Sequence, residues 1–113
     1  MATNIGARVE LAGERQFRQA LSEINAGLRV TASELALVTA KYADNDKSVA
    51  ALTARNEALQ NSITVQTAKV QTLRNALENA AILYGETDAR TLRYAESLNK
   101  AEAELIKTEK ELQ

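Results

Sequence analysis

The sequence predicts an all-α fold of elongated coiled-coil helices, preceded by a short N-terminal strand. Three observations lead to this prediction. The 21 alanines and 14 leucines supply most of the apolar residues, and both residue types favour helices. The 113 residues include no proline, the residue that most strongly interrupts a helix. Apolar residues also recur with the heptad spacing that is typical of helices wound around one another.

The first thirteen residues, 1–13, follow a pattern of their own. Apolar residues alternate with Gly6, Arg8 and Glu10 until Gly13, and a period of two predicts a short, half-buried strand. A single strand leaves its backbone unpaired, so it would need a second copy or a partner. A disordered tail is the alternative. The candidate strand residues for partner pairing are Ile5, Ala7, Val9 and Leu11.

From Phe17 onward, apolar residues follow a heptad in which every residue number divisible by seven is position a. Of the 28 a and d positions, 21 hold an apolar residue when Ala and Tyr are counted as apolar. This seam predicts a left-handed coiled coil. A small bundle of three amphipathic helices is the alternative, since both arrangements bury the same residues. The large seam residues are Phe17, Leu21, Ile24, Leu28, Leu35, Val38, Val49, Leu52, Leu59, Ile63, Val70, Leu73, Leu77, Leu98, Leu105 and Leu112.

Two short segments interrupt the helical pattern. The first contains Asn45 and Asp46, which suit a turn and the N-cap of the helix that follows. The second begins with Gly85, which suits the left-handed end of a helix, and continues to Thr87 and Asp88, either of which suits the next N-cap. The expected helices therefore span 14–43, 47–84 and 88–112.

The direction of the chain after the second break decides between two architectures. Folding the chain back pairs apolar residues such as Leu73 and Leu98, and it brings Lys69 near Glu102. A parallel arrangement instead places like charges opposite one another. We therefore expect 47–113 to form an antiparallel helical hairpin. The alternative is a continuous parallel rod about 145 Å long, because each residue adds 1.5 Å to a helix.

Two polar residues occupy positions within the predicted seam. Asn56 lies at an a position and Gln66 at a d position. Polar residues at such positions fix the register or the oligomeric state of a coiled coil, and Gln66 could also bind an ion or water on the axis of a trimer. A partly solvated layer is the alternative for each residue. The seam as a whole predicts self-association as a dimer or trimer.

Composition excludes several classes of function. The chain has no histidine and no cysteine, so it lacks an imidazole base, a thiolate nucleophile and the usual zinc ligands. Its four glycines are too scattered for a phosphate-binding loop. The net charge of -1 is unlike that of a nucleic-acid binder, and no apolar run is long enough to span a membrane. We expect no catalytic, cofactor, metal or nucleic-acid site.

Several segments of the chain, taken in order, carry a resemblance to a known family. They are Ile5-Gly-Ala-Arg-Val-Glu-Leu-Ala-Gly-Glu-Arg-Gln-Phe, Ala20-Leu-Ser-Glu-Ile-Asn, Asn45-Asp-Lys-Ser-Val-Ala-Ala-Leu-Thr-Ala-Arg-Asn-Glu, Thr72-Leu-Arg-Asn-Ala-Leu-Glu-Asn-Ala and Tyr84-Gly-Glu-Thr-Asp. Together they resemble the N-terminal part of the tail tape measure proteins of long-tailed, siphovirus-like phages and prophages. Because members of that family are many hundreds of residues long, the chain is expected to be an N-terminal fragment.

The resemblance implies a viral structural protein of the virion tail that is present in the bacterial cytoplasm during tail assembly. Such a protein sets the tail length and occupies the tail tube. The implied partners are tail tube proteins, tail tip or neck proteins, and a tail assembly chaperone.

Two other functions stay open from the sequence. One is a free-standing coiled-coil adaptor or scaffold protein. The other is a recognition fragment whose residues 1–43 become ordered when they dock on a chaperone or another partner.

Overall fold

The computed structural model describes the backbone of residues 2–112 and the side chains of residues 13–112. Its helices are α1 (Ala2–Lys41), α2 (Val49–Tyr84) and α3 (Ala89–Glu111). The all-α prediction is confirmed for this part of the chain, in which no strand occurs. Residues 1 and 113, which belong to the predicted N-terminal and hairpin units, lie outside the described residues.

The predicted N-terminal strand is wrong, because α1 already begins at Ala2. A lone strand would leave every backbone N–H and C=O group without a protein partner, whereas a helix pairs these groups internally. A glycine at position 13 costs a helix only about 1 kcal/mol relative to alanine, so it does not end the helix. The candidate strand residues Ile5, Ala7, Val9 and Leu11 all lie in the first part of α1.

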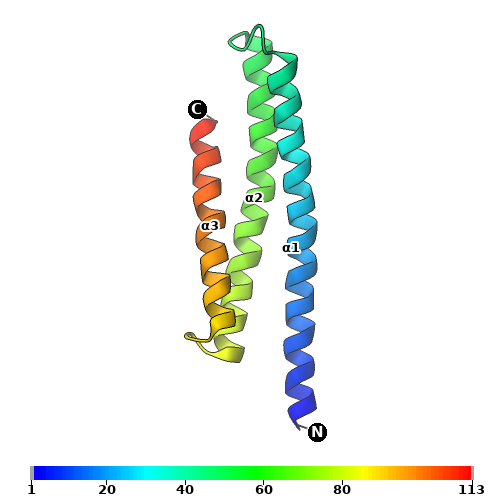
Figure 1. Cartoon of the computed structure of the whole chain (residues 1–113), viewed down its shortest axis with the longest axis vertical. Coiled ribbons are helices and arrows are strands. Elements are labelled where there is room, and N and C mark those ends of the chain that lie inside the picture. The colour runs from blue at the N-terminus through cyan, green and yellow to red at the C-terminus, as the bar shows by residue number, and fades with distance from the viewer. Residues whose placement is uncertain (1, 113) are drawn as a thin grey trace.

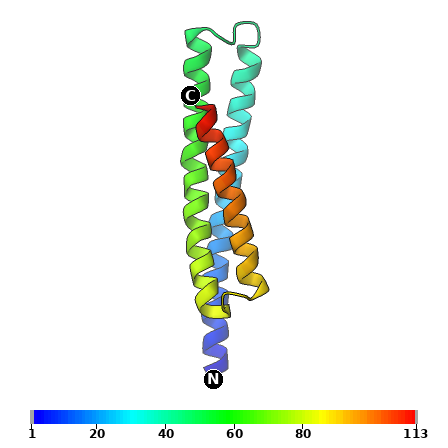
Figure 2. The same cartoon turned by 90° about the vertical axis from the view of Figure 1, so that its left-hand side faces the viewer.

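The three helices run alongside one another in an elongated bundle of 65 × 21 × 15 Å. α2 lies between α1 and α3 and packs against both (Figure 1). The chain reverses direction at each connection, so α1 and α3 both run opposite to α2 (Figures 1 and 2). The continuous rod of about 145 Å is therefore not the arrangement seen. At the N-terminal end, α1 extends beyond the other two helices (Figure 2).

The connection between α1 and α2 is a turn that ends in a helix cap. The N–H of Asn45 donates to the carbonyl of Tyr42 at 3.0 Å, and the N–H of Ser48 donates to the carbonyl of Asn45 at 3.2 Å. The N-cap of α2 is Ser48, whose hydroxyl accepts from the N–H of Ala51 at 3.1 Å. Asn45 and Asp46 thus lie in the turn, exposed, and neither is the cap that the sequence suggested.

The connection between α2 and α3 depends on Gly85 and Asp88. Gly85 ends α2 with a φ of 96°, a conformation that only glycine adopts without strain. The carboxylate of Asp88 caps α3 by accepting from the N–H of Arg90 at 2.9 Å. The hydroxyl of Thr91 donates to the carbonyl of Gly85 at 2.8 Å, which closes the turn.

The core lies along α2 where α3 covers it. Val70 and Leu73 of α2 form a buried cluster with Leu98 and Ala101 of α3. Only Leu59 and Leu73 are large side chains that are fully buried in the described part of the chain. Much of the remaining buried surface belongs to alanines of α2. Small side chains let the helices approach closely, but they bury little apolar area, so the core is thin.

Candidate functional site

Most residues of the predicted seam are buried or partly buried, but the first turns of α2 are an exception. Val49 is 82% exposed and Leu52 is 47% exposed. α3 ends before it reaches this part of α2, which therefore has only α1 beside it (Figure 1). The buried seam residues are Leu59, Val70, Leu73 and Leu98, and the partly buried ones are Phe17, Leu21, Ile24, Leu28, Leu35, Val38, Ile63, Leu77, Leu105 and Leu112.

The two polar seam residues differ in their surroundings. Asn56 is exposed, so the prediction that it lies within the core of this bundle is wrong, and its role in fixing a register or oligomeric state stays a prediction. The first part of α2 has α1 but not α3 beside it (Figure 1). Gln66 is partly buried, and its Oε1 atom is buried without a hydrogen-bond partner among the described residues. An unpaired buried acceptor destabilises a fold by about 1–3 kcal/mol.

Sequence reasoning missed the alanines Ala51, Ala58 and Ala76, which are buried on α2 although they lie outside the seam. They are buried because α2 has a neighbour on two sides and needs two apolar faces. The signal was faint, since alanine fits either a buried or an exposed position. The available clue was that Ala51 and Ala58 lie seven residues apart and therefore on the same face of α2.

One concavity is a groove of about 430 Å³ that all three helices line. Leu21 and Leu28 of α1 form one wall, and Lys100 of α3 lies on the other. Gln66 and Lys69 of α2 lie between them. The groove thus combines an apolar wall, two ammonium groups and a buried amide oxygen that has no partner. Apolar side chains beside a few polar groups are typical of binding surfaces.

The expected contact between Lys69 and Glu102 is replaced by another ion pair. Glu102 accepts from Arg74 Nη2 at 3.1 Å, and Lys69 lines the groove instead. The side chains of the pair are 48% and 42% exposed. Exposed ion pairs of this kind contribute at most about 1 kcal/mol. The pair therefore affects the alignment of α2 with α3 more than the stability of the fold.

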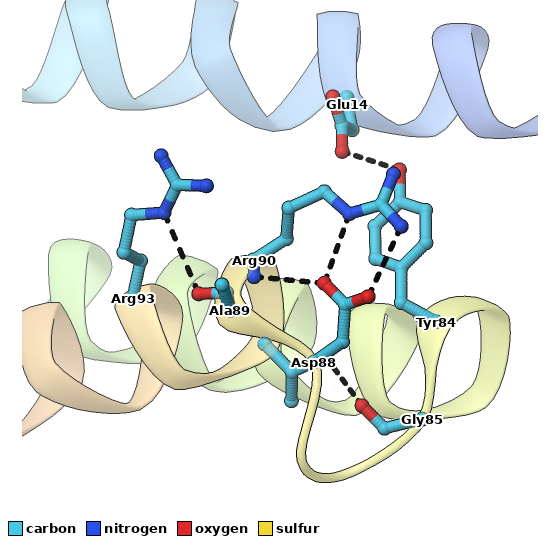
Figure 3. Close-up of polar contacts among 8 residues, drawn as sticks. Glu14, Tyr84, Gly85, Asp88, Ala89, Arg90 and Arg93 are labelled. Atoms are coloured by element: carbon cyan, nitrogen blue, oxygen red, sulfur yellow. Dashed lines mark hydrogen bonds and ion pairs between the residues drawn. The ribbon is translucent and has the colours of Figure 1, made fainter.

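A polar cluster joins α1 to the connection between α2 and α3 (Figure 3). The hydroxyl of Tyr84 donates to Glu14 of α1. The guanidinium carbon of Arg90 lies 3.5 Å from the centroid of the Tyr84 ring, a cation–π contact. Arg90 Nε also donates to Asp88 at 3.0 Å, and hydrogen bonds from Arg90 lower the pKa of the Asp88 carboxyl below its usual value. These groups engage one another, so the cluster has a structural role.

Glu14 also lies near a second tyrosine, Tyr94 of α3. Partial burial raises the pKa of Tyr94, and the negative charge of Glu14 raises it further. No sequence pattern connects Glu14 with Tyr84 or Tyr94, which lie seventy and eighty positions away, so only the fold shows these contacts.

Neither a metal-ligand cluster nor a membrane-spanning helix occurs among the described residues. No three acidic, histidine or cysteine side chains there are grouped closely enough to hold a metal ion. Within the same part of the chain, no helix combines the length and the apolar character needed to cross a membrane. Comparisons of the chain with protein-family models, curated proteins and solved structures gave no match.

Proposed function

We propose that this chain is the N-terminal part of a phage tail tape measure protein, which sets tail length and occupies the tail tube during assembly. The observation that carries the proposal is that almost all of the described residues lie in three long α-helices. The resemblance of the sequence segments described above to tape measure proteins also supports the proposal. A helix has a fixed rise per residue, so it converts residue number into length.

We propose further that the seam packs as a coiled coil, with α2 and α3 as its antiparallel hairpin. The buried cluster of Val70, Leu73, Leu98 and Ala101 supports this arrangement, because residues on facing helices meet there. The core is thin, so opening the bundle exposes little apolar area. Straightening both connections would extend the described residues to about 165 Å at 1.5 Å per residue. The bundle is then the form before assembly and the extended rod the form inside the tube.

Heptad deletion in the phage gene that encodes this segment tests the proposal. Removing 49–76, which is four heptads, should shorten the tail by about 42 Å at 1.5 Å per residue. Duplicating the same residues is the matched control and should lengthen the tail by the same amount. Tail lengths are measured on many particles by electron microscopy. Tails of unchanged length in both variants would contradict the ruler function.

A second candidate is an adaptor that binds an amphipathic helix of a partner protein. The groove favours it, because it combines apolar side chains of α1 with Gln66, Lys69, Lys100 and Glu104, and Gln66 Oε1 lacks a donor within the described residues. An adaptor works as the folded bundle, whereas a ruler works as an extended rod. A cysteine pair at Val70 and Ala101 separates the two, since the natural chain has no cysteine. Oxidation of the chain in the assembly from which it is isolated should give the intramolecular disulfide for an adaptor and none for an extended rod.

A further inference from the structure

A second heptad row lies on the outer face of α1. It consists of Ala26, Val30, Ser33, Leu37 and Ala40, separated by alternating steps of four and three residues. All five are exposed, and the two largest, Val30 and Leu37, are 58% and 67% exposed. At about 100° per residue this row lies on the side of α1 opposite to the seam. We call these five residues the outer row.

The outer row has no partner helix within the described bundle. The helix that α1 packs against is α2, and the seam residues of α1 are partly buried on that side. The seam that the sequence predicted to join copies is therefore already used inside one chain. Self-association through the seam would require the bundle to open, whereas association through the outer row would not.

The charges beside the outer row are complementary between two copies. The outer row has its own heptad register, in which Val30 and Leu37 are the a positions. In this register Arg29 lies at a g position and Glu34 at the e position five residues further on. In a parallel pair, a g residue faces the following e residue of the partner helix. Arg29 of each copy would thus face Glu34 of the other, giving two ion pairs by symmetry. Neither residue forms an ion pair among the described residues.

We propose that the outer row of α1 joins two copies of this chain in a parallel, two-fold symmetric pair. The row is about 21 Å long, from Ala26 to Ala40 at 1.5 Å per residue, which is short for an isolated coiled coil. α1 is already helical within the bundle, so pairing does not have to nucleate a helix. The small residues Ala26, Ser33 and Ala40 let the two backbones approach closely. This inference does not depend on a role in the phage tail.

Charge reversal tests the pair directly. Sedimentation of the purified chain over a concentration series should show a reversible dimer. Arg29→Glu alone and Glu34→Arg alone each replace both attractions with repulsions, and each should weaken dimerisation about tenfold. An equal mixture of the two variants restores both attractions and should recover dimerisation. A wild-type chain that stays monomeric throughout the series, or a mixture that is as weak as its parts, overturns the proposal.

Two further variants locate the surface and its direction. Leu37→Glu should abolish the dimer while helicity stays unchanged, because the residue is exposed. Ile82→Glu is the matched control, since Ile82 is an 83% exposed apolar residue of α2, and it should leave the dimer intact. Ala26→Cys should form a disulfide-linked dimer on mild oxidation, because residue 26 meets its own copy only in a parallel pair. Dimerisation that survives Leu37→Glu, or the absence of this disulfide in a dimeric sample, overturns the proposal.

Discussion

Leu73→Ala is the substitution that most directly tests the packing of α2 against α3. Leu73 is 2% exposed and belongs to the buried cluster with Val70, Leu98 and Ala101. The substitution removes three side-chain carbons, each worth about 0.8 kcal/mol of transfer free energy, so the transfer part is about 2.4 kcal/mol. A residual cavity adds to this loss. We expect the free energy of unfolding to fall by about 3 kcal/mol.

Leu92→Ala is the matched control, because it makes the same change on α3 at a side chain that is 54% exposed. Less apolar area is lost there, and alanine favours the helix slightly more than leucine does. The expected loss is about 1 kcal/mol or less. Urea unfolding followed by circular dichroism measures both values. If the two variants lose equal stability, Leu73 is not the buried residue that this packing requires.

Four further outcomes follow from individual residues. Gln66→Leu removes the buried oxygen that lacks a partner, and should raise the free energy of unfolding by about 1 kcal/mol in urea unfolding; a clear loss would mean that the amide is satisfied. Gly85→Ala should lower the free energy of unfolding by about 1–3 kcal/mol in thermal unfolding. A Cβ at this position would meet no atom, so the loss comes from the backbone φ of 96°. The pKa of the Asp88 carboxyl is lower in the folded chain than its ordinary value of 3.8, so the ionised carboxylate stabilises the fold at pH values above 3.8. This contribution is lost as the pH falls through the lower folded pKa. Asp88→Asn should therefore lose less stability than the wild type in acid titrations below about pH 4. A double cysteine variant at Val70 and Ala101 should form an intramolecular disulfide in the purified chain, and products linked only between chains would contradict the folded-back arrangement.

Local signals in the sequence were sufficient for the helices and the second connection. The heptad seam and the absence of proline predicted long helices, and local backbone chemistry pointed to Gly85 and Asp88. Both residues act within a few positions of themselves, through a positive φ and a hydrogen bond to the N–H of Arg90. Such short-range effects depend little on the remainder of the fold, so they can be predicted from sequence.

The wrong predictions concern residues whose structure depends on how many other strands or helices lie beside them. Alternation near Ile5 resembled a strand, but nothing in the sequence supplied a second strand to pair with it. The heptad placed Asn56 in a core, yet its side chain is exposed, because a heptad does not show how far α3 extends along α2. The contact of Glu14 with Tyr84 depends on how far α1 extends past the turn. A single heptad describes one buried face, whereas α2 has two.

The central position of α2 has a consequence for how the chain folds. Each helix packs against the helix that precedes or follows it in the chain, and the backbones of α1 and α3 stay apart. Contacts between sequence neighbours give a low contact order, and helical domains of this kind fold within microseconds to milliseconds. Synthesis adds only about 5–20 residues per second. The pairing of α1 with α2 can therefore be complete before α3 has emerged from the ribosome.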